Sequence, residues 1–329
     1  MKKIVSLILV LVLFSFMLVS CSDEELGAEK IRIGYMAGPT GMGMAKLIHD
    51  NSGDSNTSKY EFKKYTDTEA AKADLAAGKI DVICLPTNEA AQYYNKGISD
   101  IQVLAVNCLN SLYLLSDKST TIASLEDLNG KTIYTCQNGT PRIILEEVLN
   151  RNGIDATVSF VYGEKTIKTP ADLGALVVSG DLPIAVLPEP IVTSSLLTIN
   201  KNGNTDISYS IDLNLADGWS DGGIETPITM GCVVGSKDFV SKNKALINSF
   251  LDEYKASISF VSSSENRDTA AEYIVETGIL GAKPAAIKAL SNLGGAIAYI
   301  DGIEMRAALV NFYGIINMKQ PALGFYYFK

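Results

Sequence analysis

The fold is decided by the stretch AGKIDVICLPT at residues 77–87, which the chain repeats without a gap as SGDLPIAVLPE at residues 179–189. In each copy a helical segment ends near a glycine, a short apolar run follows, and a Leu-Pro pair with a polar residue leads into the next helix. A short apolar run bounded by Gly and Pro is typical of a buried strand. An internal repeat of this kind indicates two α/β lobes of the same design.

Strands and helices are predicted to alternate around both copies. The predicted strands are residues 31–36, 60–65, 81–85, 131–136, 157–162, 184–187 and 227–234. The predicted helices are residues 42–49, 68–78, 89–95, 142–150, 171–179, 191–197, 243–261, 268–277, 284–293 and 304–315. Strands that alternate with helices of this length imply crossover units, so the fold class is α/β with a mainly parallel sheet flanked by helices in each lobe.

The last third of the chain is rich in predicted helices, which need an existing surface to pack on. We therefore expect lobe 1 to consist of residues 30–108 plus 230–329, and lobe 2 of residues 109–229. This division requires two crossover strands, near Val103 to Ser116 and near Thr226 to Val234, and these are expected to form a hinge between the lobes.

The first 21 residues have the pattern of a secretion signal. Two lysines precede an apolar run at residues 4–19, which is short for a membrane span and is followed at once by the polar residues 22–25. The sequence LVSC at residues 18–21 resembles a bacterial lipobox, whose cysteine carries a diacylglyceride and acyl chains such as palmitate. We expect a lipoprotein signal peptide at residues 1–20, lipid attachment at Cys21 and a tether at residues 21–29. The alternative is an uncleaved anchor with a chance cysteine.

Charge and residue usage exclude several classes of function. The formal net charge is −9 and no basic stripe is present, so nucleic acid is not an expected partner. His49 is the only histidine and no ligand cluster accompanies it, so we expect no metal site and no cofactor.

The remaining cysteines are Cys84, Cys108, Cys136 and Cys232. An even count allows a disulfide framework, but strand-like surroundings and the size of the chain favour buried thiols.

Several motifs together resemble one family of binding proteins. The stretch SLEDLNGKTI at residues 124–133 is similar to the start of the second lobe in that family, LPEP at residues 187–190 to its acidic-proline turn, and Gly78 to Asp81 to its G-x-x-D segment. The order of these motifs resembles the substrate-binding lipoproteins of ABC importers, in the branch that binds nitrate, sulfonate, taurine and thiamine-pyrimidine precursors. The resemblance implies a two-lobed, type II periplasmic-binding-protein fold, with ABC permease and ATPase subunits as partners.

The ligand itself does not follow from the resemblance, because the first turn at residues 38–43 departs from the turns of the named binding proteins. In open parallel sheets the ligand crevice lies beyond the carboxyl ends of the strands. Four loops leave predicted strands at such ends, at residues 38–43, 86–88, 137–140 and 188–190. Thr140-Pro141 suits the start of a helix, whose free N–H groups can receive a ligand oxygen. The alternative for each loop is ordinary helix capping without a ligand.

A specific role is predicted for each of two residues, Glu189 and Trp219. Glu189, between two prolines, is predicted to accept hydrogen bonds from ligand N–H or O–H groups or to pair with a ligand cation; the alternative is a rim residue or an ion pair with a lysine. Trp219, in the Gly-rich stretch 217–223, is predicted to be a lid over the cleft; the alternative is an aromatic anchor to the core. The predicted ligand-binding set is Gly38, Thr40, Gly41, Met42, Thr87, Asn88, Asn138, Gly139, Thr140, Glu189 and Trp219.

The leading hypothesis is a lipid-anchored receptor on the extracytoplasmic face of the cell membrane, which binds a small polar molecule and does not transform it. An enzyme of the same fold, such as a lyase or a pyrimidine synthase, is the first alternative. It lacks a histidine-based constellation, because His49 falls late in a predicted helix, away from the loops. A stand-alone sensory lipoprotein is the second alternative.

The lipobox gives a direct prediction. Cys21→Ala removes the thiol that carries the lipid, so the protein should be released from the membrane fraction or remain an unprocessed precursor, with its folded body unchanged. Labelling with a palmitate analogue, together with fractionation and circular dichroism, measures this. Lipid labelling and mature size that match the wild type would contradict attachment at Cys21.

Overall fold

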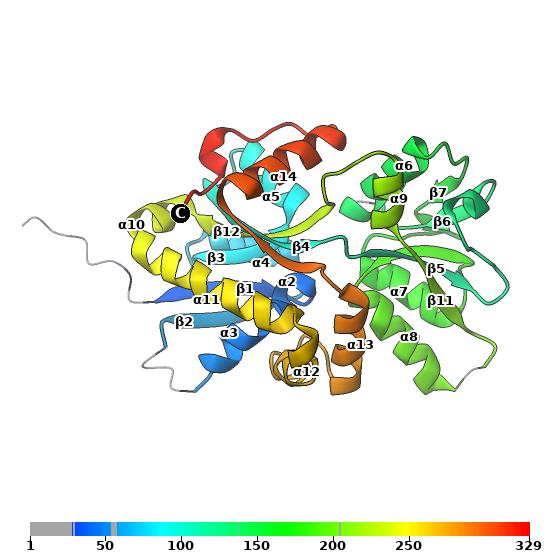
Figure 1. The fold of residues 1–329 in the computed structure, drawn as a ribbon, viewed down its shortest axis with the longest axis horizontal. Coiled ribbons are helices and arrows are strands. Elements are labelled where there is room, and N and C mark those ends of the chain that lie inside the picture. The colour runs from blue at the N-terminus through cyan, green and yellow to red at the C-terminus, as the bar shows by residue number, and fades with distance from the viewer. Residues whose placement is uncertain (1–27, 29, 54–57, 138, 204) are drawn as a thin grey trace, which may run out of the picture.

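The computed structural model describes residue 28 and residues 30–53, 58–137, 139–203 and 205–329. These residues form two α/β lobes that lie side by side (Figure 1), which confirms the predicted fold class. The predicted signal peptide, Cys21 and most of the tether lie outside the described residues. Within the described ranges, no helix has the length and apolar character needed to cross a membrane.

The sheet of lobe 1 has six strands. Their order is β13 (Ile297–Ile300), β4 (Ile101–Leu109), β12 (Thr229–Ser236), β3 (Val82–Pro86), β1 (Ile31–Met36) and β2 (Tyr60–Tyr65). β1 pairs in parallel with β2 and β3, whereas β12 is antiparallel to both β3 and β4. The parallel strands β1, β2 and β3 therefore direct their carboxyl ends to one edge of the sheet.

The sheet of lobe 2 repeats this plan. Its order is β11 (Tyr209–Asn214), β5 (Leu112–Asp117), β10 (Ile184–Pro188), β6 (Thr132–Tyr134) and β7 (Thr157–Ser159). β6 is parallel to β7 and β10, and β10 is antiparallel to β5. β10 thus takes the position that β3 has in lobe 1, and these are the two strands of the internal repeat. A small separate ribbon pairs β8 (Val161–Tyr162) with β9 (Lys165–Thr166).

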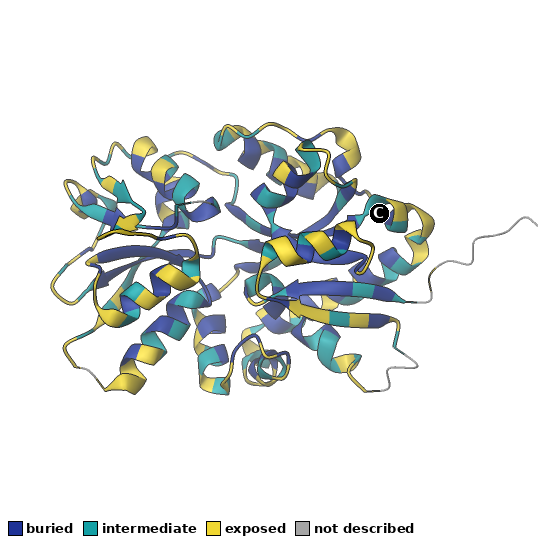
Figure 2. Ribbon diagram, turned by 180° about the vertical axis from the view of Figure 1, so that it is seen from behind, coloured by how far each residue is buried: buried dark blue, intermediate teal, exposed yellow. Residues whose placement is uncertain are grey.

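Helices cover both faces of each sheet, and the strands between them are largely buried (Figure 2). In lobe 1 one face carries α4 (Thr68–Ala76), α5 (Thr87–Asn95) and α14 (Gly302–Ile315), and the other carries α3 (Ala45–Asp50), α11 (Lys244–Ser262), α12 (Arg267–Glu276) and α13 (Lys283–Leu293). In lobe 2, α6 (Thr140–Arg151) and α9 (Leu215–Asp221) lie opposite α7 (Pro170–Ser179) and α8 (Ile191–Asn202). The short helices are α2 (Pro39–Met42), α10 (Lys237–Lys242), η2 (Leu125–Leu128), η3 (Ser264–Asn266) and η4 (Leu323–Phe325).

The chain passes between the two sheets twice, from β4 to β5 and from α9 to β12 (Figure 1). Asn110 lies in the first passage with a left-handed φ of 46°, a conformation that Asn tolerates better than most residues. Its backbone N–H donates to the carbonyl of Ile228 at 3.0 Å, and its Oδ1 accepts from the N–H of Ile228 at 3.0 Å. The two passages are therefore tied to each other at Asn110.

Asp81, the aspartate of the G-x-x-D segment, joins β3 to β1. It is 4% exposed and accepts hydrogen bonds from the backbone N–H of Arg32 at 2.8 Å and from its guanidinium at 2.5 and 2.9 Å. Charge-assisted hydrogen bonds of this kind are stronger than neutral ones. The carboxylate therefore fixes the two inner strands whose ends carry the first two predicted loops.

The four cysteines of the described residues are buried and not in disulfides, as the buried-thiol prediction expected. Burial raises the pKa of the Cys84, Cys108 and Cys136 thiols to about 12. Because the thiolate is the reactive form, these side chains are packing residues.

One prediction about local structure is wrong. The Gly-rich stretch 217–223 does not form a lid: most of it belongs to helix α9, and Trp219 is 2% exposed. The Trp219 Nε1 donates to the carbonyl of Thr226 at 2.7 Å, and its ring lies 6.1 Å from that of Phe312 on α14. Trp219 is therefore a core anchor between the lobes, which is the alternative that the sequence left open. The strands β11 and β13 were not predicted.

Candidate functional site

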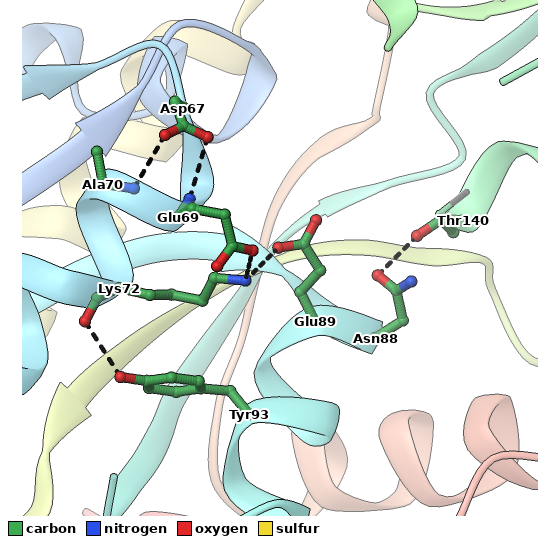
Figure 3. A network of polar contacts seen from close by, with 8 residues as sticks. All are labelled: Asp67, Glu69, Ala70, Lys72, Asn88, Glu89, Tyr93 and Thr140. Carbon is green, nitrogen blue, oxygen red and sulfur yellow. Dashed lines mark hydrogen bonds and ion pairs between the residues drawn. The ribbon is translucent and has the colours of Figure 1, made fainter. Parts of the chain in front are cut away.

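The predicted loops of the two lobes contact each other at Asn88 and Thr140. Asn88 is in the first turn of α5, directly after β3, and Thr140 begins α6 in lobe 2. The Thr140 hydroxyl donates to Asn88 Oδ1 at 2.8 Å (Figure 3), and the two residues are 4% and 2% exposed. Next to Asn88, Glu89 forms an ion pair with Lys72 of α4 at 3.1 Å, which holds the first turn of α5 in place (Figure 3).

Glu189, at the end of β10, is a buried carboxylate at the boundary between the lobes. It is 1% exposed and precedes a cis proline, Pro190. Thr193, one turn further along in α8, donates its backbone N–H to Oε2 at 3.2 Å and its hydroxyl to Oε1 at 2.9 Å. Asn292 of α13, in the chain that builds lobe 1, donates its Nδ2 to Oε1 at 2.7 Å. The carboxylate is therefore held from both lobes.

Burial raises the pKa of Glu189 above its ordinary value, because the charged form loses its hydration. The hydrogen bonds from Asn292 and Thr193 favour the charged form and oppose this shift, and the positive charge of Lys288 on α13 acts in the same direction. Among the described residues, no cation lies within ion-pair distance of Glu189. The site thus contains a buried carboxylate that accepts hydrogen bonds from neutral donors.

A groove of about 520 Å³ lies beside this carboxylate. Its lining residues are Tyr113, Leu196, Ile211, Asp212, Leu213, Asn214, Lys288 and Asn292. The first six belong to lobe 2, whereas Lys288 and Asn292 belong to α13. The Tyr113 hydroxyl donates to the carbonyl of Asn292 at 2.6 Å and closes one side of the groove. Tyr113 therefore lies at the lobe boundary.

The first predicted loop, at residues 38–43 after β1, is built differently from the other three predicted loops. Gly38 accepts hydrogen bonds from the N–H groups of Gly41 and Met42 at 3.0 and 2.9 Å, and a Cβ on Gly41 would lie 2.1 Å from the carbonyl oxygen of Met36. Met42 is fully buried in the lobe 1 core, so its place in the predicted set reflects packing. Thr40 is half-buried, and its carbonyl accepts from the Tyr254 hydroxyl at 3.3 Å.

The other residues discussed from the sequence lie in different parts of the structure. The Thr87 hydroxyl donates to the carbonyl of Thr229, so its polar group is directed into lobe 1. Gly139 precedes α6 with a φ of 96°, which favours glycine. Asn138 lies outside the described residues. His49 stacks on Tyr273 and pairs with Glu276 at 2.6 Å, on the α3–α12 side of lobe 1.

Sequence reasoning missed Thr193 and Asn292. Thr193 could have been found, because it follows Glu189 by one helical turn and side chains four residues apart share a helix face. Asn292 gives no such signal: it is one polar residue near the end of an amphipathic helix, and only the packing of α13 against α8 brings it to Glu189.

Comparisons with known proteins agree with this fold. Residues 59–171 match the NMT1/THI5-like family model. No curated protein sequence matches the chain. The structure is similar to an ABC transporter protein from Parabacteroides distasonis, with a TM-score of 0.71 and 21% identity over 92% of this chain and 100% of that one. It is also similar to the periplasmic aliphatic sulphonate binding protein SsuA from Escherichia coli, with a TM-score of 0.68 and 17% identity over 92% of both chains.

A third similar structure is the periplasmic nitrate-binding protein NrtA from Synechocystis, with a TM-score of 0.56 and 14% identity over 84% of this chain and 74% of that one. These matches confirm the predicted resemblance to ABC-importer binding proteins and the two-lobed fold. The named neighbours are binding proteins, not enzymes.

The pKa of Glu189 gives a prediction about stability. Since folding raises this pKa, the contribution of Glu189 to the free energy of unfolding is fully present below the ordinary glutamate value of about 4.3 and is lost as the pH rises through the folded-state value. Urea unfolding at a series of pH values should therefore show wild type losing stability relative to Glu189→Gln across that window.

Thr193→Val is the matched variant, because it removes one donor to the charged form and keeps the shape of the side chain. Without this donor the pKa of Glu189 should rise further, so the loss of stability should extend to higher pH. A difference between wild type and Glu189→Gln that is constant with pH, or grows as the pH rises, would contradict a raised pKa.

Proposed function

We propose that this chain is an extracytoplasmic solute-binding lipoprotein of an ABC importer, which captures a small polar organic molecule between its lobes and delivers it to a permease. The observation that supports the proposal is that Asn88 and Thr140, which were predicted from strand ends in different lobes, are in direct contact. In open parallel sheets this edge is where ligands bind.

The ligand chemistry follows from the charges at the boundary. The buried charged group there is a carboxylate, and its acceptor atoms favour ligand N–H or O–H donors or a ligand cation. A polyanion would be repelled by Glu189. We therefore propose a polar, donor-bearing molecule that does not carry several negative charges.

The proposed contacts come from both lobes: Thr40 and Asn88 from lobe 1, and Thr140 and Glu189 from lobe 2. The backbone at Gly38, Gly41 and Gly139 shapes the loops around them. We propose Asn110 and Ile228 as the hinge, since they connect the two passages of the chain. Separation of the lobes there would free Asn88 and Thr140 from each other and admit the ligand.

The remaining elements of the proposal concern the membrane. Lipid attachment at Cys21 would hold the body near the permease, and the ATPase subunit would act through that permease on the opposite side of the membrane. Closure of the lobes around the ligand would create the form that the permease recognises.

The binding test begins with the molecule that co-purifies with the protein from its native host, identified by mass spectrometry. Glu189→Gln removes a charged acceptor from a buried site, which costs about 1 to 3 kcal/mol and should weaken binding by at least roughly fivefold in a calorimetric titration. Glu225→Gln, an exposed carboxylate before β12, is the matched control and should bind like wild type.

Wild-type affinity in Glu189→Gln would contradict the placement of the ligand at the lobe boundary. Conversion of the co-purified molecule to a product on incubation would contradict a binding protein and favour the enzyme of the same fold.

A further inference from the structure

Asn292 connects lobe 1 to lobe 2 with both its side chain and its backbone. Its Nδ2 donates to Glu189 Oε1 at 2.7 Å and to the Thr193 hydroxyl at 3.1 Å. Its carbonyl accepts the hydroxyl of Tyr113 at 2.6 Å. In lobe 2, Glu189 directly follows β10, whereas Thr193 belongs to α8 and Tyr113 to β5. One residue of α13 therefore makes three hydrogen bonds to three residues of the other lobe.

The helix that carries Asn292 is fixed to lobe 1. Ala286, Ala289, Leu290 and Leu293 of α13 are buried in the lobe 1 core, on the face shared with α11 and α12. Downstream, β13 pairs with β4 in the lobe 1 sheet. Because α13 is held at its apolar face and by the strand that follows it, Asn292 must move with lobe 1 when the lobes separate.

Separation of the lobes changes the environment of Glu189. A buried carboxylate needs hydrogen-bond donors, and losing one donor leaves a costly unpaired charge. Thr193 stays with Glu189 because both are in lobe 2, whereas Asn292 leaves. Among the described residues, Asn292 is the side chain of lobe 1 that donates to this carboxylate. The orientation of Glu189 and the closure of the lobes are therefore linked through one amide group.

We infer that Asn292 is a positioning residue of the proposed site: it orients the Glu189 carboxylate from the opposite lobe and stabilises the closed arrangement of the lobes. The inference deepens the proposed function and rests on it for the role of Glu189 in ligand binding. The Asn292 amide is an N–H donor, and Glu189 accepts a hydrogen bond from it. A ligand with an N–H group would offer the same kind of donor.

The test measures the distance between the lobes directly. Spin labels on cysteines introduced at the exposed residues Asn200 of α8 and Thr269 of α12 report the separation of the lobes on the side of Asn292. The native cysteines of the described residues are buried and should not react. Pulsed electron spin resonance then gives the distance distribution in each variant.

Asn292→Ala removes the donor, and Asn292→Asp places a second carboxylate against Glu189, so both should shift the distribution to longer distances, Asn292→Asp the more strongly. The double variant Glu189→Gln with Asn292→Asp exchanges donor and acceptor and should return the distribution towards wild type. Ser291→Ala, which loses only a bond within α13, is the matched control and should not change it.

Wild-type distributions in Asn292→Ala and Asn292→Asp, or a double variant that stays as open as Asn292→Asp alone, would overturn the inference. Melting temperatures show that each variant is folded, and Asn292→Asp keeps the test available if Asn292→Ala is unstable. The double variant also separates the two proposals: if it closes and yet binds the co-purified molecule like wild type, the role of Glu189 in binding is wrong and the role of Asn292 in closure stands.

Discussion

A carboxylate cannot be buried without donors, and Glu189 takes its donors from both lobes. Two of them come from Thr193 in its own lobe, and the third comes from Asn292 in the other. The free energy of this one charged group therefore depends on how the lobes are placed. A molecule that offers a donor to Glu189 affects both its own binding and the closure of the cleft.

The position of that carboxylate follows from the way in which the chain builds its two sheets. In each lobe an inner strand of the internal repeat, β3 or β10, lies next to an antiparallel strand, β12 or β5, that comes directly from a passage between the lobes. The Pro-containing ends of β3 and β10 are thereby brought to the lobe boundary, close to the passages. Asn110 and Ile228 connect the two passages, and we propose that a small rotation at this point separates Asn88 from Thr140.

Sequence reasoning predicted the fold well where turn residues bound a strand. Strands 31–36 and 60–65 have the predicted bounds, because Gly and polar residues mark their ends. It failed for Trp219, since Asp217, Gly218 and Gly222 suggested a loop where packing against Phe312 of α14 and Val148 of α6 favours a helix. The positions of Asn88, Thr140 and Glu189 could be predicted because each follows a strand end. Asn292 could not, since no local pattern specifies which helix of lobe 1 meets α8.

We propose that a small molecule closes the two lobes over the boundary that contains Glu189. Small-angle X-ray scattering on protein stripped of its co-purified molecule by unfolding and refolding, before and after that molecule is restored, tests it most directly. We expect a smaller radius of gyration when the molecule is bound. A molecule that binds tightly while the radius of gyration stays the same would contradict it.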